Sequence, residues 1–166
     1  KIILSEDLGE AYKDAKKIRD VFKIPGMKIL QFSFGNGDPY HEMDQNTVLY
    51  TGTHDNSTCI GWFDELLNDK ELNSEKNSIN LVDEVIKYID YKPSDLIHWN
   101  MILYAMSSKA SYCIIPLQDI LGLNDNSRMN IPGTVGNNWL WRFKKETLTE
   151  AIKEKLKLIT KDVNRI

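Results

Sequence analysis

Two acidic residues of this 166-residue chain follow short apolar runs, a position that suits acid–base chemistry. The run 47–50 favours a strand and ends shortly before Asp55, and the run 2–5 ends at Glu6. In barrels of parallel strands, the carboxyl ends of the strands converge on one rim, where the active site lies. Retaining glycosidases use two carboxyl groups about 5–5.5 Å apart, one as nucleophile and one as acid/base. Glu6 and Asp55 are therefore the first catalytic candidates, with glycosidic bond chemistry as the expected reaction.

Aromatic and amide side chains gather in the segment 128–142. Trp139 and Trp141 stand beside Asn138 and Arg142, and Asn130 precedes them. Aromatic faces stack on sugar rings, and amide and guanidinium groups bond sugar hydroxyls. This composition favours a carbohydrate surface. Alternatively, both tryptophans plug the wall of the fold.

Asp55 also has a purely structural explanation. An aspartate after a strand can cap the helix that follows, and Asn56, Ser57 and Thr58 are equally able to do so. The strand-end position does not separate a catalytic Asp55 from a capping one.

A metal-dependent hydrolase is a rival class, with His54, Asp55 and His41 as ligands. Metal sites usually contain closely spaced histidine pairs, and this chain has none. His98 lies in an apolar stretch, which is typical of a histidine packed in a core. We therefore predict no metal site.

Strands and helices alternate along the chain. We expect strands at 2–5, 27–34, 47–50 and 111–117, and helices at 11–22, 61–67, 81–89, 97–106 and 148–159. Residues 97–106 are apolar nearly all round, so that helix should be buried between other elements. The polar stretch Asn68–Asn80 is expected to be a surface loop. The alternation predicts an α/β fold with about four parallel strands and covering helices, in one domain over residues 1–166.

Composition narrows the partners and the compartment. The hydrophobic content is 42%, and the formal net charge is −3 without a long basic run. We therefore expect neither nucleic acid nor a membrane surface as a partner. Cys59 and Cys113 are far apart and form no CxxC pair, which fits a reducing compartment. A glycan on Asn56, in the sequon Asn-Ser-Thr, would block the proposed site and so also favours an intracellular protein.

Five ordered motifs resemble the 4-α-glucanotransferases, the amylomaltases of glycoside hydrolase family 77. They are Ser5-Glu6-Asp7-Leu8-Gly9, the segment Ile24–Phe32, Tyr50-Thr51-Gly52-Thr53-His54-Asp55-Asn56, Pro116-Leu117-Gln118-Asp119, and the segment from Arg128 to Arg142. The resemblance spans nearly the whole chain. The motif around His54-Asp55 is highly specific.

The resemblance implies a retaining transfer of α-1,4-glucan segments between maltooligosaccharides, without a cofactor. The family's general acid/base falls on Glu6, and its transition-state stabiliser falls on Asp55. His54 is expected to bond sugar hydroxyls, and His41 falls where the family places a histidine in a rim loop. We add three substrate-binding candidates in the matching motifs: Asn56, Asn130 and Trp139.

The family's nucleophile is an aspartate in an Arg-x-Asp-His motif, and this sequence has no such motif. Asp119 does not match it and is interpreted as a structural anchor. The chain thus resembles the C-terminal half of a TIM-type (β/α)8 barrel, whose other half lies upstream. We expect it to be inactive alone, and to self-associate or to need its missing half.

One alternative is a non-catalytic carbohydrate-binding or regulatory module descended from such an enzyme. The sequence upstream of Lys1 would distinguish the two. The expected compartment is the cytoplasm, or the plastid if the host is a plant or alga.

Overall fold

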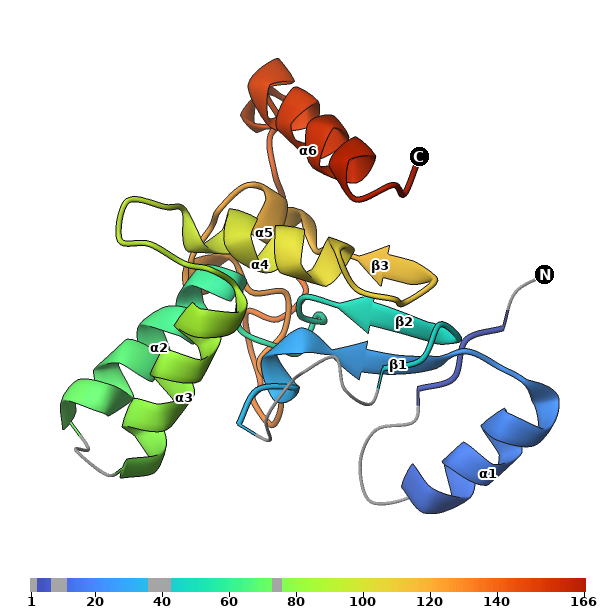
Figure 1. Cartoon of the computed structure of the whole chain (residues 1–166). Helices are drawn as coiled ribbons and strands as arrows, with labels where there is room; N and C mark the ends of the chain where they lie inside the picture. Colours follow the sequence, from blue (N-terminus) through green and yellow to red (C-terminus); the bar gives the residue numbers. More distant parts are fainter. Residues whose placement is uncertain (1–2, 7–11, 36–42, 73–75) are drawn as a thin grey trace.

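The computed structural model describes residues 3–6, 12–35, 43–72 and 76–166. In chain order the elements are α1 (Tyr12–Phe22), β1 (Gly26–Ile29), the 3-10 helix η1 (Leu30–Phe32), β2 (Thr47–Tyr50), α2 (Cys59–Leu72), α3 (Lys76–Tyr88), α4 (Ile97–Met106), β3 (Tyr112–Ile114), α5 (Leu117–Ile120), the 3-10 helices η2 (Asp125–Ser127) and η3 (Lys145–Thr147), and α6 (Glu150–Asp162). The predicted α/β class is confirmed (Figure 1).

Within the described ranges, three parallel strands form one sheet in the order β1-β2-β3. Gly26 pairs with Thr47 and Ile29 with Tyr50, and on the other side Tyr50 pairs with Ile114. The middle strand is apolar and β-branched, and Val48 and Leu49 are fully buried. All three strands point the same way, so their carboxyl ends share one edge of the sheet.

Helix α4 is the centre of the packing, as its apolar sequence predicts. On one side Met101 and Ala105 join a core with β2, α2 and α3, and on the other Trp99 and Ile102 meet α6. Figure 1 shows α4 between the sheet and α6, with α2 and α3 side by side beyond one end of the strands. A helix covered on two sides needs apolar residues on both, and within α4 only Leu103 is exposed (43%).

The prediction of a surface loop over Asn68–Asn80 is wrong where the structure describes it. Residues 68–72 complete α2, and residues 76–80 begin α3. The pair packs through Phe63 and Val85, and this tertiary contact stabilises both helices. Lys70, Glu71 and Leu72 are also good helix formers, which favours a helix over a loop there.

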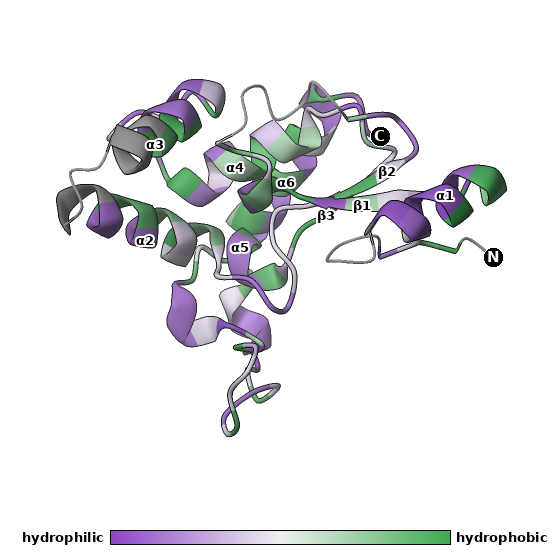
Figure 2. Cartoon of the chain, turned by 90° about the horizontal axis from the view of Figure 1, so that it is seen from below, coloured by the Kyte–Doolittle hydropathy of each residue, from purple (hydrophilic) through white to green (hydrophobic). Residues whose placement is uncertain are grey.

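The N-terminal part also differs from the expectation. Residues 3–6 form no strand, and Ser5 donates one backbone hydrogen bond to the carbonyl of Pro25 (2.9 Å). Helix α1 was expected to cover that strand, yet its apolar residues Ile18, Val21 and Phe22 are 61%, 76% and 70% exposed. Figure 2 shows α1 apart from the other helices, beside β1. Without a strand at 2–5, the apolar stripe of α1 has nothing to pack against in the described chain.

The other two predicted strands are shorter than expected. β1 ends at Ile29 because the chain turns into η1, and this turn lets the buried Gln31 donate to the carbonyl of Ser57 (2.8 Å). β3 ends at Ile114, and Pro116 directly precedes α5. Proline has no amide hydrogen to continue the ladder. None of the described helices combines the length and the apolar character needed to cross a bilayer.

Candidate active site at the carboxyl edge of the sheet

The loop from β2 to α2 carries His54, Asp55 and Asn56, three of the residues that the sequence singled out. Its turn is closed by Asn56, whose side-chain oxygen accepts from the amide (2.9 Å) and the hydroxyl (2.7 Å) of Thr53. The side-chain oxygen of Asn56 is therefore occupied within the loop, although the side chain also borders the cavity described below. An asparagine that bonds its own backbone nearby is a common way to fix a turn.

Two other aspartates, not Asp55, bind the first amides of α2. Asp119 accepts from the amide of Cys59 (2.7 Å), and Asp125 accepts from the amide of Thr58 (2.8 Å). The hydroxyl of Thr58 in turn accepts from the amide of Gly61 (3.1 Å). Negative groups at a helix N-terminus are favourable, and here that role is filled without Asp55.

Asp119 joins three elements and is 2% exposed. Besides Cys59 at the start of α2, it accepts from the hydroxyl of Thr51 just after β2 (2.7 Å), while itself lying in α5. Burial raises the pKa of Asp119, and the bonds from Cys59 and Thr51 act against that rise. The interpretation of Asp119 as a structural anchor agrees with these contacts.

The carboxylate of Asp55 points to residues far along the chain. Asn130 donates its Nδ2 to Oδ1 of Asp55 (2.6 Å), and Nε2 of His54 lies 3.3 Å from the same oxygen. The amide of Asn130 also donates to the carbonyl of His54 (3.0 Å). The side chains of Asp55 and His54 are 45% and 53% exposed, so a ligand can reach both.

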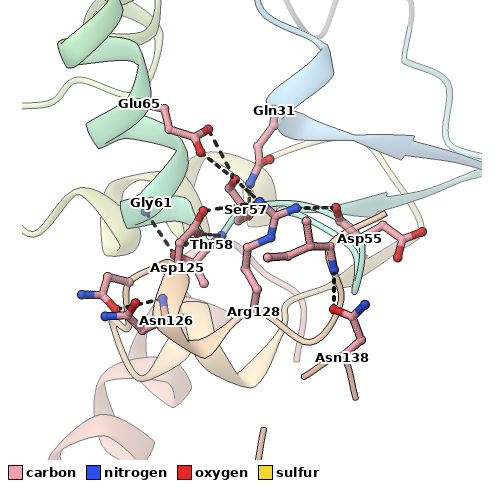
Figure 3. Close-up of polar contacts among 12 residues, drawn as sticks. Gln31, Asp55, Ser57, Thr58, Gly61, Glu65, Asp125, Asn126, Arg128 and Asn138 are labelled. Atoms are coloured by element: carbon pink, nitrogen blue, oxygen red, sulfur yellow. Dashed lines mark hydrogen bonds and ion pairs between the residues drawn. The ribbon is translucent and has the colours of Figure 1, made fainter. Parts of the chain in front are cut away.

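Arg128 holds this loop from the other side (Figure 3). Its Nη2 donates to the carbonyl of Asp55 (2.9 Å), and its Nη1 donates to the hydroxyl of Ser57 (3.1 Å). Nη1 also lies 3.5 Å from the carboxylate of Asp125. A planar guanidinium can reach several acceptors at once, which a lysine cannot.

Trp139 places an aromatic ring over His54. The ring centroids are 4.9 Å apart, and Trp139 is 53% exposed. Its backbone is left-handed, with φ 65°, and its amide donates to the carbonyl of Met129 (2.6 Å). The preceding Asn138 binds the loop that leads to it, accepting from the amide of Ile131 (3.0 Å). Strained backbone of this kind is most often retained at functional sites.

A cavity of about 190 Å³ lies beside Asp55, between its loop and the segment that carries Arg128 and Trp139. His54, Asn56, Arg128 and Trp139 border it, together with Pro116 and Gln118 beyond β3. The cavity therefore lies at the carboxyl edge, where strand direction predicted a site. One aromatic ring, several hydrogen-bonding groups and a nearby carboxylate could bind a polyol and stabilise positive charge on it.

Glu6 does not reach this site in the structure. Ser5 is bonded to Pro25, immediately before β1 begins, so Glu6 lies near the amino ends of the strands. Asp55 follows the carboxyl end of β2, which runs parallel to β1. The structure thus brings together His54, Asp55, Asn130 and Trp139, with Asn56 at the same cavity, and leaves Glu6 apart. His41 lies outside the described residues.

The remaining histidine is a core residue, as predicted. His98 is 6% exposed and packs beside Trp99, with ring centroids 5.4 Å apart. Burial, and secondarily the Lys155 ammonium, lower the pKa of His98 to about 4. In the described part of the chain, no three histidine, cysteine or acidic residues are grouped to hold a metal ion.

Two residues of the site were missed by sequence reasoning. The sequence pattern assigns no role to Arg128, although Arg128 begins a family motif, and none to Asp125. Their partners Ser57 and Thr58 are 71 and 67 residues away, so local spacing gave no signal.

The known proteins that this chain resembles in sequence share the same description. A sequence model of the family described as 4-alpha-glucanotransferase matches residues 1–149. The chain is 40% identical to a 4-alpha-glucanotransferase of Synechocystis sp. over 163 residues, or 95% of this chain and 30% of the relative. It is 43% identical to the chloroplastic/amyloplastic 4-alpha-glucanotransferase DPE1 of Arabidopsis thaliana, over 87% of this chain and 24% of the relative.

A solved structure agrees. An amylomaltase from Streptococcus agalactiae, in complex with acarbose, is similar with a TM-score of 0.83 and 34% identity, over 98% of this chain and 32% of that one. The chain spans about a third or less of the length of these relatives.

Proposed function

Because the chain belongs to the 4-alpha-glucanotransferase family, we propose that it is part of an enzyme that transfers α-1,4-glucan segments between maltooligosaccharides. The proposed reaction is a retaining double displacement. The observation that carries the proposal is the carboxylate of Asp55, which is bound by Asn130 (2.6 Å) beside the exposed ring of Trp139.

In this proposal Asp55 stabilises the transition state. Glycosyl transfer passes through an oxocarbenium-like state, and a carboxylate fixed beside it favours the developing positive charge. His54 and Asn130 orient the carboxylate and offer polar groups to sugar hydroxyls. Trp139 supplies a stacking face, and Asn56 borders the same cavity.

Glu6 is proposed as the general acid/base of the complete enzyme, on the match of its motif to the family. For this role the segment 3–6 must pair along β1 instead of stopping at Pro25. A shift of three residues along a strand corresponds to roughly 10 Å, which would bring Glu6 level with the end of β1. His41, which lies between β1 and β2 in the sequence, is proposed to bind the glucan.

We propose that the three-stranded sheet belongs to a (β/α)8 barrel whose other strands and nucleophile come from outside these 166 residues. The parallel strands, the covering helices and the polar site at the carboxyl edge support this arrangement. The missing part of the barrel is then an obligatory partner. The proposed compartment is the cytoplasm, or the plastid if the host is a plant or alga.

The test is disproportionation of maltotriose by the complete protein and by the 166-residue chain. We expect the complete protein to release glucose and longer oligosaccharides, and the 166-residue chain to release none. Asp55→Asn in the complete protein should lower the transfer rate by about 100-fold or more. Asp64→Asn, on the exposed face of α2, is the matched control and should leave the rate unchanged.

Two results would contradict the proposal. One is a complete protein that binds maltooligosaccharides without transferring them, which would favour the non-catalytic module. The other is an Asp55→Asn variant as active as the wild type.

A further inference from the structure

Arg128 bonds the chain at Asp55 and again just after it. It bonds the carbonyl of Asp55 itself and the hydroxyl of Ser57, two residues later (Figure 3). The carboxylate of Asp55 is held separately, by Asn130. The backbone and the side chain of Asp55 are therefore fixed by two residues that lie two positions apart.

The guanidinium is itself held in place by the start of α2. Asp125 lies 3.5 Å from Nη1 of Arg128 and also binds the amide and the hydroxyl of Thr58. Gly61 makes room for this carboxylate, because a Cβ at position 61 would lie 2.0 Å from Oδ1 of Asp125. A chain of contacts thus runs from α2 through Asp125 to Arg128 and on to Asp55.

This arrangement carries an energetic cost. The side chain of Arg128 is 17% exposed, and its buried Nε has no hydrogen-bond acceptor among the described residues. Leaving a buried donor unbonded is unfavourable, and such groups in native structures call for an explanation. A requirement for exact placement of Asp55 supplies one.

We propose that Arg128 is a positioning residue for Asp55. By fixing the carbonyl of Asp55 and the following turn, it sets the direction in which the carboxylate leaves the backbone. This inference rests on the proposed function, in which Asp55 acts in the transition state. Arg128 then contributes to kcat through Asp55, and its side chain also borders the cavity.

The experiment compares Arg128→Lys and Arg128→Ala in the complete protein, with maltotriose as substrate. A displaced catalytic group can lower a rate by about 100-fold, and we expect a fall of that order in kcat for Arg128→Ala with KM nearly unchanged. Millimolar guanidinium should partly restore kcat of Arg128→Ala. Arg128→Lys should remain folded but stay below wild-type kcat, since one ammonium cannot reach both acceptors.

Arg165→Ala is the matched control. Arg165 also donates to backbone carbonyls, those of Met106 (2.6 Å), Ser108 (3.0 Å) and Ala110 (3.0 Å), at the end of α4. This variant should lower the melting temperature without lowering kcat at temperatures where it is folded, and guanidinium should not raise its kcat.

A double-variant cycle tests the connection to Asp55. If Arg128 and Asn130 act on the same carboxylate, combining Arg128→Lys with Asn130→Ala should lower kcat by less than the product of the two single effects. Wild-type kcat in Arg128→Lys, a KM effect alone, or fully multiplicative effects would overturn the inference. An active Asp55→Asn variant would instead overturn the proposed function, so the two failures are distinguishable.

Discussion

The two ends of the sheet differ in how they are held together. At the carboxyl edge, long-range bonds from Asp119, Asp125, Arg128 and Asn130 fix the loop after β2. At the other side, α1 exposes its apolar residues, and the segment 3–6 is joined to the sheet by the bond from Ser5. The comparison teaches that contacts within this chain organise the site around Asp55, whereas the described residues leave the apolar residues of α1 exposed.

The strongest test of the carboxyl edge is Gly61→Ala. The added Cβ would lie 2.0 Å from a carboxylate that Thr58 and Arg128 hold in place, so it cannot be accommodated without breaking those contacts. We expect a loss of about 4 kcal/mol in the free energy of unfolding, measured by urea denaturation of the complete protein.

Gly133→Ala is the control for that variant. Its Cβ would meet nothing within 4 Å, and only its φ of +75° opposes the change. We expect a loss of about 1 kcal/mol. Equal effects at the two glycines would mean that crowding at Asp125 does not matter.

A second test uses pH and His98, which packs against Gly122 just beyond α5. The pKa of His98 is about 4 in the folded protein, against 6.5 as its ordinary value. Between pH 4 and 6.5 the unfolded chain therefore binds more protons than the folded protein. The contribution of His98 to the free energy of unfolding is fully present above pH 6.5 and is lost as the pH decreases towards 4. The loss should approach about 3 kcal/mol.

His98→Gln should remove this part of the pH dependence. The measurement is the difference between wild-type and variant unfolding free energies across the acid range, which cancels the titration of other groups. Parallel pH profiles for the two proteins would show that His98 keeps its ordinary pKa.

The smallest effect on stability is expected on α1. Val21→Lys replaces a residue that is 76% exposed, so the free energy of unfolding of the 166-residue chain should change by no more than about 0.5 kcal/mol. Self-association of that chain should nevertheless decrease, as measured by sedimentation, because the apolar stripe is interrupted.

Val135→Lys is its counterpart at the carboxyl edge. Val135 is fully exposed and lies in a loop instead of on the apolar stripe of a helix, so this variant should leave self-association unchanged. If Val135→Lys decreased self-association more than Val21→Lys, the self-associating surface would lie at the carboxyl edge and not on α1.

The sequence predicted best those elements whose secondary structure follows from the pattern of their own residues. The run Val48-Leu49 is buried in the middle strand, and the apolar residues 97–106 form the enclosed helix. Local order also identified Asp55 and His54, because a strand and a loop placed them at the carboxyl edge.

The failures have physical causes of a different kind. Residues 68–72 and 76–80 look polar, yet packing between α2 and α3 makes them helical. Arg128 bonds Ser57 and Asp55, which precede it by 71 and 73 positions, and no local sequence pattern reveals such contacts. The strand expected at 2–5 is absent from the described residues, since a strand needs neighbours as well as propensity.

The left-handed backbone of Trp139 has a consequence for anyone who evolves this protein. A bulky residue at φ 65° is strained, and glycine or asparagine would relieve the strain while removing the ring beside His54. A library selected for heat resistance alone should therefore enrich glycine or asparagine at position 139. If Trp139 binds sugar as proposed, the same library selected for turnover should retain tryptophan, so stability and the proposed activity would favour different residues at this position.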